Sequence, residues 1–538
     1  MTGGTSGSAA GPTILATDVA QVLAQGWAQQ RAGDLESAAK LCEQALTPDP
    51  ENPDGHHLLG VIAYQLGHAD VALHHLQRAV AHRSEDAALH GTIGSAYRAL
   101  GRPQQARASL ETAVRLDPDA AGTRNDLGIT LAEQGLLAEA LPHFQAAVAL
   151  DPKLAQAHCN LGRVLGGLER LDDAVASYRE ALRLDAGYVN ARNNIGIDLT
   201  RLARYEEALA ELDEALRLDP ENAAAHSNRA VLLLRLGRFV EGFAEYEWRW
   251  RTFPPRSPPR DFAQPQWNGE DLRAATLMLH AEQGFGDTLQ FCRYAPLVAR
   301  ACAKVFLEVP RPLLRLFRQS LAPENLEIIP RLKDFPATQA LPPTDYHCPL
   351  LTLPRILGTT VDDVPAAVPY LAADATLTAG WTQSLRELPG RKVGLVWAGL
   401  PQYSDDAHRS LPLARLAPLG TVSGVTFVSL QTGEAAAQAA SAGLTIYDAS
   451  PGLRDFADTA ALVAALDLVI SVDTATAHLA GGLGKPVWLL NRFDTDWRWL
   501  VDRSDSPWYP TMRIFRQPRR GDWDSVMAQI CVELARGG

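Results

Sequence analysis

The chain has 538 residues, of which 46% are hydrophobic and 21% charged, and its formal net charge is −12. These values are typical of a folded protein with several domains, and the acidic balance argues against nucleic-acid binding, which needs a basic surface. No apolar run reaches the ~18 residues that membrane insertion needs, and the six scattered cysteines form no Cys-x-x-Cys pair, so we predict neither a metal site nor a disulfide framework.

Residues 1–18 are predicted to form a disordered tail. Residues 1–11 are rich in Gly, Ser, Thr and Ala, and they lack the basic start and apolar core of a signal peptide. The cysteine usage fits a reducing compartment. We therefore expect a cytoplasmic protein.

A period of 34 residues dominates residues 19–251. Glycine marks the period in six units, and Ala230 holds the seventh position. The six glycines are Gly26, Gly60, Gly94, Gly128, Gly162 and Gly196. Alanine stands 12 and 19 residues after each glycine, and a larger side chain stands 16 residues after it. This pattern resembles the tetratricopeptide repeat (TPR) and predicts an all-α superhelical solenoid of about seven helix pairs.

A row of polar residues stands two positions before the glycine column in the later repeats. The row is Asp126, Asn160, Asn194 and Asn228. A carboxamide both donates and accepts hydrogen bonds, so such a row can pair with an extended peptide backbone of any sequence. It resembles the asparagine ladder of O-linked N-acetylglucosamine transferases, and we predict that it binds an acceptor peptide. The alternative is that asparagine is merely common at this repeat position.

Residues 252–274 are predicted to be a proline-rich linker, because the prolines between 254 and 259 cannot continue a helix. An α/β pattern follows, with two Rossmann-like domains expected over residues 275–385 and 386–538. The expected strands are Thr276–His280, Val305–Val309, Leu326–Ile329, Lys392–Trp397, Val425–Leu430, Leu444–Tyr447, Leu468–Val472 and Val487–Leu490.

Polar residues gather at the carboxyl end of the strand Leu468–Val472. They are Asp473, Thr474, Thr476 and His478, and a short helix with small side chains begins among them. Ligands of open α/β sheets bind outside the carboxyl ends of strands, and a helix start offers free N–H groups to a phosphate. This turn is therefore the predicted binding site for a phosphorylated ligand.

The first α/β strand ends in a second turn of interest, which contains Gly284, Gly286 and Asp287. Its spacing is not Gly-x-Gly-x-x-Gly, so it does not indicate a dinucleotide site. Together with the Asp473 turn, the N-terminal repeats and the motif Trp497-Arg-Trp-Leu500, it resembles bacterial TPR protein glycosyltransferases. Their catalytic half has the GT-B fold of heptosyltransferases, with an interdomain cleft, and the group includes enzymes that modify flagellin.

The resemblance assigns roles to residues of this chain. Asp287 matches the general base, and Glu282 and His280 compete for that role in the same turn. The expected donor-binding residues are Gly286, Arg409, Gln431, Asp473, Thr474, Thr476 and His478. Asp287 could instead be only a helix cap, His478 a packed helix residue and Arg409 a solvated cation. Ala475 departs from the family's usual Asp-Thr-Gly, which leaves the sugar open.

The resulting hypothesis is an inverting, metal-independent glycosyltransferase without a cofactor. A nucleotide-sugar would be the donor, and a Ser or Thr hydroxyl of a protein held by the repeats, with flagellin as a candidate, would be the acceptor. Two alternatives stay open. The chain could be a TPR scaffold whose nucleotide-binding half is catalytically silent, or a transferase acting on a glycan or lipid-linked acceptor.

Overall fold

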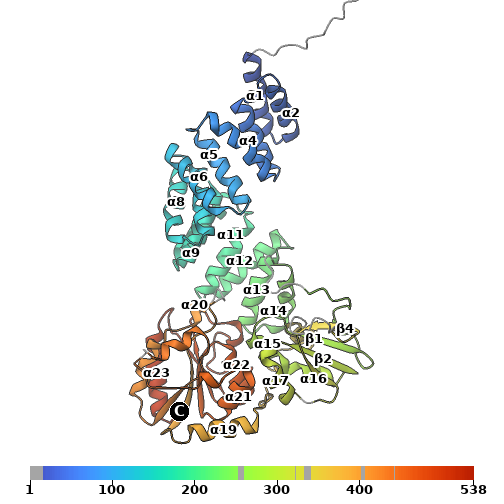
Figure 1. Ribbon diagram of the computed structural model, residues 1–538, viewed down its shortest axis with the longest axis vertical. Helices are drawn as coiled ribbons and strands as arrows, with labels where there is room; N and C mark the ends of the chain where they lie inside the picture. Colours follow the sequence, from blue (N-terminus) through green and yellow to red (C-terminus); the bar gives the residue numbers. More distant parts are fainter. Residues whose placement is uncertain are drawn as a thin grey trace, which may run out of the picture. The chain divides into compact units, whose positions relative to one another are not determined.

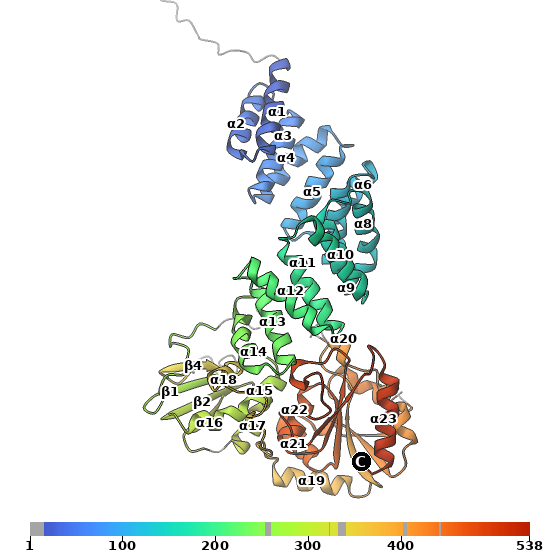
Figure 2. The same cartoon turned by 180° about the vertical axis from the view of Figure 1, so that it is seen from behind.

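The computed structural model describes residues 16–252, 260–321, 323–331, 341–401, 406–440 and 443–537. The chain divides into two compact units, Met1–Leu218 and Asp219–Gly538 (Figures 1 and 2). Most of the predicted tail, residues 1–15, and residues 253–259 of the predicted linker lie outside the described residues. The first helix begins at Ala16, so the last three residues assigned to the tail are helical.

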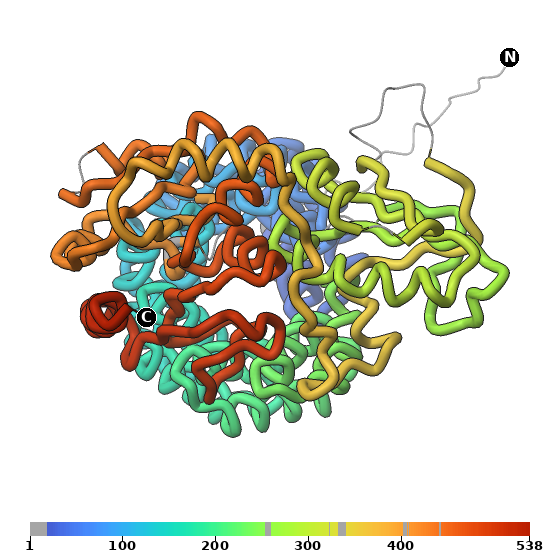
Figure 3. Tube along the Cα trace, turned by 90° about the horizontal axis from the view of Figure 1, so that it is seen from below, coloured from blue at the N-terminus to red at the C-terminus, as the bar shows by residue number. Residues whose placement is uncertain are grey.

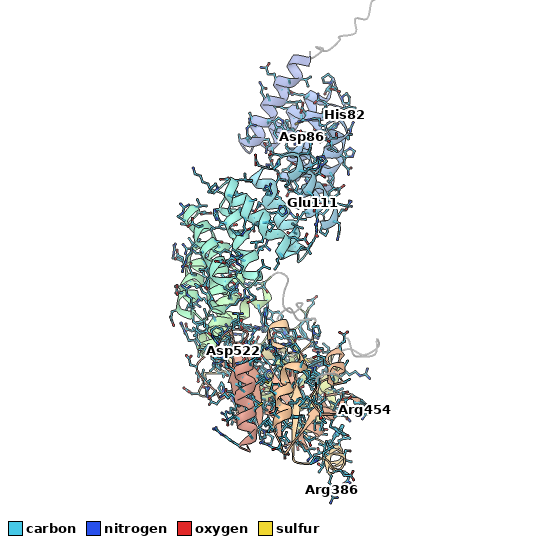
Figure 4. All side chains as sticks on the ribbon, turned by 90° about the vertical axis from the view of Figure 1, so that its left-hand side faces the viewer. His82, Asp86, Glu111, Arg386, Arg454 and Asp522 are labelled. Carbon is cyan, nitrogen blue, oxygen red and sulfur yellow. The ribbon has the colours of Figure 1, made fainter. Side chains whose placement is uncertain are left out.

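The first unit is a series of antiparallel helix pairs, which confirms the predicted all-α repeat array. Its helices are α1 Ala16–Arg31, α2 Leu35–Leu46, α3 Pro53–Gln65, α4 Ala69–His82, α5 Ala87–Ala99, α6 Pro103–Leu116, α7 Ala121–Glu133, α8 Leu137–Leu150, α9 Ala155–Gly167, α10 Leu171–Leu184, α11 Val189–Arg201 and α12 Tyr205–Leu218. Several helices start at a capping carboxylate; Asp86, labelled in Figure 4, accepts from the N–H groups of Ala88 and Leu89.

The glycine column lets the two helices of a repeat pack closely. A Cβ atom added to Gly60 would lie 2.5 Å from the side chain of Leu76, and one added to Gly162 would lie 2.6 Å from Tyr178. These are the large side chains found sixteen residues after each glycine. The sequence period therefore reflects one packing contact repeated along the array.

The second unit contains two parallel sheets, which confirms the predicted α/β class. The first has the order β3-β2-β1-β4 and the second the order β10-β9-β8-β5-β6-β7. The strands are β1 Thr276–His280, β2 Lys304–Val309, β3 Leu326–Pro330, β4 Tyr346–Pro349, β5 Arg391–Val396, β6 Val425–Ser429, β7 Ile446–Asp448, β8 Leu468–Val472, β9 Val487–Asn491 and β10 Met512–Arg516. Sequence analysis missed β4 and β10, since β4 is short and ends at a proline, and both lie at sheet edges.

Helices cover the two sheets, and in Figure 3 the yellow-green and the orange-to-red parts of the second unit form two separate lobes, one for each sheet. The helices are α15 Phe285–Phe291, α16 Ala295–Ala299, α17 Arg311–Ser320, α18 Leu353–Ile356, α19 Ala375–Leu385, α20 Asp406–Arg409, α21 Phe456–Ala464, α22 Ala475–Gly482 and α23 Trp523–Ala535. The lobes meet where α15 of the first packs against α22 of the second (Figures 1 and 2).

The seventh repeat of the predicted array over residues 19–251 lies within the second compact unit. It consists of α13 Ala223–Arg235, α14 Phe239–Glu245 and a short 3₁₀ helix, η1 Tyr246–Trp250. The buried rings of Phe239 and Phe243 pack against Trp497 of the second lobe. This repeat is therefore part of the α/β unit's core and not a free end of the solenoid.

No helix in the described part of the chain combines the length and hydropathy that a bilayer crossing needs.

Candidate functional site

The topology of the second sheet indicates at which edge, the one formed by the carboxyl ends of its strands, a ligand would bind. The strand order changes direction between β5 and β8, because the chain moves from β5 toward β7 and later from β8 toward β10. Ligands of such sheets bind outside the carboxyl ends of the strands at this switch point. The loop after β5 contains Arg409, and the turn after β8 contains Asp473 and Thr474.

A small pocket lies at this edge, with a cavity volume of about 40 Å³. It is lined by Arg409, Asp473, Leu490, Asn491, Arg492 and Asp496. Two of the predicted residues, Arg409 and Asp473, thus share one pocket although they come from different loops. The other lining residues lie at the end of β9 and just after it.

The turn after β8 is built by short hydrogen-bonded contacts. Thr474 is the residue before the first turn of α22, with an extended backbone, and its hydroxyl lies 3.1 Å from that of Ser471. Thr476 lies half-buried in the first turn of α22. The helix start that follows Asp473 has the layout that can bind a phosphate, and the phosphate contact predicted there stays a prediction.

Asp473 carries an unusual carboxyl group. Burial, followed by the negative charge of Asp496, raises its pKa to about 6, although Arg498 and Arg409 act in the opposite direction. A raised pKa means that the fold holds the charged form of this carboxyl at a cost. Such a group at a strand end is typical of a binding or catalytic site.

His478 is buried on α22 behind this turn. Its Nδ1 lies 2.8 Å from the hydroxyl of Tyr509, its ring stacks on Trp499, and its Nε2 lies 4.0 Å from Oδ1 of Asp473. Burial and the positive charge of Arg498 hold the pKa of His478 well below its usual range. The imidazole is therefore neutral, with its Nε2 side directed at the predicted donor turn.

Gly286 lies where the two lobes touch. A Cβ atom there would lie 2.9 Å from Cδ2 of His478 and 3.7 Å from Cα of Ala475. The missing side chain lets α15 approach α22 closely. The geometry shows this packing role, and the donor contact predicted for Gly286 stays a prediction.

The side chain of Asp287 connects the two lobes. Its Oδ2 accepts the N–H of Gly284 at 3.0 Å, so it stabilises the start of α15 from the third helical position, whereas Gly284 and not Asp287 is the N-cap residue. Its Oδ1 forms an ion pair with Arg498, which follows the second sheet's strand β9. Arg498 also donates from Nε to Gln290 at 2.8 Å and from Nη1 to Asp496 at 2.9 Å. Asp496 lines the pocket, so one guanidinium joins Asp287 to the pocket wall.

The two competing base candidates are enclosed. The side chain of Glu282 is 2% exposed and receives two hydrogen bonds from Arg249, at 2.8 and 3.0 Å. His280 is buried with its Nε2 3.3 Å from Nδ1 of His347, and burial holds its pKa well below the usual range. Asp287 is thus the candidate of the three that reaches the second lobe.

Arg409 and Gln431 shape the loop after β5. Arg409 donates to Asp406 at 3.1 Å, and Gly399 leaves room for this pair, because a Cβ there would lie 2.1 Å from Asp406. The amide oxygen of Gln431 accepts the N–H groups of Trp397 and Ala398 at 3.1 and 3.0 Å.

Gln431 is buried, and its Nε2 donates to carbonyl oxygens of the chain. It therefore holds the loop that carries Arg409, and its predicted direct donor contact is not tested.

The predicted peptide row divides between the units. Asp126, Asn160 and Asn194 lie half-buried on α7, α9 and α11, the first helices of successive repeats in the first unit. Asp126 accepts the hydroxyl of Ser95 at 3.1 Å, and Asn160 donates to Asn125 at 2.9 Å. Asn228 lies on α13 of the second unit, in the same position of its own repeat.

Sequence reasoning missed several residues of the site. They are Gln290, Asn491, Arg492, Asp496 and Arg498. One signal was present: Asn491 and Arg492 end a buried strand, as Asp473 does, and Arg498 lies in the motif that carried the family resemblance. The partner of Arg498 could not be found that way, because it is 211 residues away in the chain.

The comparisons with known proteins identify the repeats. Family models described as tetratricopeptide repeat match residues 30–95, 92–155 and 155–188, and a TPR repeat model matches residues 199–237. The array consists of TPR units, and such arrays are scaffolds that bind protein partners.

One curated relative is Protein FlbA of Caulobacter vibrioides. It is 31% identical over 287 residues, which cover 50% of this chain and 48% of FlbA. The chain thus spans about half the length of the curated relative it matches. Among solved structures, YrrB, a TPR protein with an unusual peptide-binding site, is 23% identical with a TM-score of 0.31 and covers 35% of this chain and 96% of its own. PilF of Pseudomonas aeruginosa is 18% identical with a TM-score of 0.37 and covers 39% and 96%.

Proposed function

We propose that the second unit is a glycosyltransferase that moves a sugar from a nucleotide-sugar to a Ser or Thr hydroxyl of a protein recruited by the repeats. Flagellin is a candidate acceptor. One observation carries the proposal: Arg498 contacts both Asp287, from the turn after β1, and Asp496, from the pocket at the end of β9. A candidate base of one lobe thus lies beside a candidate anion pocket of the other.

The proposed reaction is a single displacement. Asp287 accepts the proton of the acceptor hydroxyl while that oxygen attacks the anomeric carbon, and the bond to the leaving nucleotide phosphate breaks. Attack opposite to the leaving group inverts the anomeric centre. The phosphate gains negative charge in this step, and the guanidinium of Arg409 with the N–H groups at the start of α22 would stabilise it without a metal ion.

The donor residues divide into direct and indirect contacts in this proposal. Thr474, Thr476 and His478 would contact the sugar and phosphates, and Asp473 would line the pocket beside them. Gln431 would act through the loop it holds, and Gly286 by keeping α15 close to α22. On the repeats, Asp126, Asn160, Asn194 and Asn228 would bind the backbone of the acceptor protein.

A nucleotide panel tests the donor site. UDP, GDP, ADP, CDP and CMP are added to the wild type and to Asp473→Ala, and thermal unfolding is followed. A nucleotide at about 100 times its Kd stabilises the folded state by ~2.7 kcal/mol, which shifts the melting temperature visibly. We expect one nucleotide class to stabilise the wild type and to lose this effect in the variant. No shift with any of them would contradict the proposal.

Asp287→Ala tests the reaction itself. If Asp287 is the base, transfer from the nucleotide-sugar identified in this way should fall by about 10²–10⁴-fold while the nucleotide still binds. Full transfer by the variant would remove Asp287 from the mechanism. The side chains of His280 and Glu282 are buried and paired, so they do not offer a simple replacement.

A second function is favoured by one specific contact. Both carboxylate oxygens of Asp287 are engaged, one by the Gly284 N–H and one by Arg498. A TPR scaffold that binds a nucleotide without turnover would need no free base. Nucleotide binding by the wild type with no transfer to any acceptor, and no hydrolysis of the nucleotide-sugar, would support this scaffold function.

A further inference from the structure

Three consecutive residues after β9 reach three different parts of the second unit. Trp497 packs its ring against Phe243 of the seventh repeat, at 5.7 Å and 89°. Arg498 forms its ion pair with Asp287 of the first lobe, and Trp499 stacks on His478 at 5.2 Å. Leu500 then adopts a positive φ of 49°, a conformation that bulky residues rarely accept. The surroundings therefore hold this turn in a strained backbone conformation, as is common at functional sites.

Arg498 donates hydrogen bonds to three acceptors and not to a single partner. Its donors reach Asp287, Gln290 and Asp496, and its side chain is 11% exposed. Two of these acceptors are carboxylates, and Asp496 already lines the pocket with Arg409. The guanidinium of Arg498 thus donates to a carboxylate that forms part of the pocket wall.

Asp287 has one oxygen that the fold itself requires. Oδ2 accepts the N–H of Gly284 at the start of α15, whereas Oδ1 faces Arg498. The guanidinium of Arg498 occupies Oδ1, so an acceptor hydroxyl can reach this oxygen only when Arg498 turns elsewhere.

We propose that Arg498 is a second phosphate-binding residue of the pocket and that it exchanges partners. It pairs with Asp287 in the structure, and it turns to the diphosphate of a nucleoside diphosphate or nucleotide-sugar that enters beside Arg409. This turn frees Oδ1 of Asp287 for the acceptor hydroxyl. The inference rests on the proposed function, and it makes donor binding a condition for the base to act.

A double-mutant cycle tests the exchange by calorimetric titration of the full-length chain. The probes are UDP, GDP, ADP and CDP. Inorganic pyrophosphate, which has the diphosphate but no nucleoside, is titrated for comparison. Asp287→Asn keeps an oxygen for the Gly284 N–H but removes the charge that competes for Arg498. We expect it to bind the nucleoside diphosphate about fivefold more tightly, or more, than the wild type does. Arg498→Gln should bind it about tenfold more weakly.

The decisive measurement is Asp287→Asn in the Arg498→Gln background. If Arg498 exchanges partners, the gain from Asp287→Asn should disappear, because there is no guanidinium left to release. A gain of the same size in both backgrounds would mean that Asp287 acts only through general repulsion, and it would overturn the exchange. Arg498→Lys, which keeps the charge, should recover part of the affinity lost in Arg498→Gln.

Arg315→Gln is the matched control. Arg315 also bridges the two lobes, from α17 to Asp455 and Asp458 beside α21, but it does not line the pocket. It should lower the melting temperature without changing nucleotide affinity. If Arg315→Gln weakened binding as much as Arg498→Gln, the role of Arg498 would be structural and the inference would fail.

Different results would contradict the proposed function and the exchange of partners by Arg498. If neither the wild type nor any variant binds a nucleoside diphosphate, the proposed function fails and the exchange with it. If the wild type binds one and transfers sugar, but Asp287→Asn binds it no more tightly, the exchange alone is overturned.

Discussion

At the residue scale, two aspartates that follow the neighbouring strands β8 and β9 behave in opposite ways. Burial and the charge of Asp496 raise the pKa of Asp473 to about 6. Burial would also raise the pKa of Asp494, but Arg492 and Arg520 outweigh it and lower that pKa. The fold thus disfavours the charge on Asp473 and favours the charge on Asp494.

Substitution by asparagine should therefore change stability in opposite directions. At pH 7.5 both carboxyls are ionised, so Asp473→Asn removes an unfavourable charge and should raise the free energy of unfolding by about 1–2 kcal/mol. Asp494→Asn removes a favourable charge and should lower it. Urea unfolding followed by intrinsic tryptophan fluorescence measures both.

The pH dependence of stability tests the direction of the Asp473 pKa shift independently. Asp473 binds more protons in the folded than in the unfolded state between about pH 4 and 6, so its contribution to stability falls as the pH rises through that range. The advantage of Asp473→Asn should accordingly shrink as the pH is lowered from 7.5 to 4.5. An advantage that grew on acidification would contradict the raised pKa.

At the element scale, the turns inside the repeats share one backbone requirement. The second residue after the first helix of a repeat takes a positive φ, and glycine meets this need at Gly33, Gly67, Gly101 and Gly135. Glu169 and Ala203 take the same conformation in the fifth and sixth repeats, with φ of 62° and 60°. Left-handed backbone costs a residue with a side chain about 1–2 kcal/mol, so these two turns are strained.

Ala203→Gly should therefore stabilise the array. Relief of the strained φ exceeds the entropy that glycine loses on folding, and we expect a gain of ~0.5–1 kcal/mol. Gly135→Ala is the reverse control, because nothing lies within 4 Å of the added Cβ and only the backbone conformation changes. It should destabilise by about 1 kcal/mol. Far-UV circular dichroism in urea measures both free energies of unfolding. A change of the same sign in the two variants would disprove the argument.

At the scale of the whole molecule, the seventh repeat decides where the chain can be cut. Arg249 of η1 is buried, and it pairs with Glu282 after β1 and donates to Thr352 at 2.9 Å. Phe239 and Phe243 complete the core around Trp497 and Trp508. The division into two compact units at Leu218–Asp219 thus places the seventh repeat with the two sheets.

A chain that begins at Asp219 should fold, and one that begins at residue 252 should not. The shorter chain leaves the side chain of Glu282 buried without Arg249 and exposes the rings that Phe239 and Phe243 cover. The combined loss is on the order of 5–10 kcal/mol, comparable to the stability of a whole domain. Soluble expression and a cooperative thermal transition distinguish the two chains. A cooperative transition from the chain beginning at 252 would show that the seventh repeat is dispensable.

The folded chain beginning at Asp219 also separates the acceptor classes. A transferase directed at proteins should lose its acceptor without α1 to α12 but keep nucleotide binding. A transferase acting on a glycan or a lipid-linked sugar should keep much of its transfer activity.

Local sequence patterns determined the repeats and most of the strands of this protein. Each repeat meets the same requirement of a small residue opposite a large one, as Gly60 and Leu76 show, and each central strand is a run of residues buried on both faces. The turn at Asp473 could also be found, because the carboxyl end of a buried parallel strand is where ligands bind.

Tertiary structure alone decided which charged groups share the site. Whether Glu282 or Asp287 is open to the second lobe depends on Arg249 and Arg498, which reach them from 33 and 211 residues away in the chain. The seventh repeat likewise continues the sequence period but packs with the sheets. The physical reason is the same in both cases: periodicity reports which face of an element is buried, but not which distant side chain covers that face or neutralises a charge there.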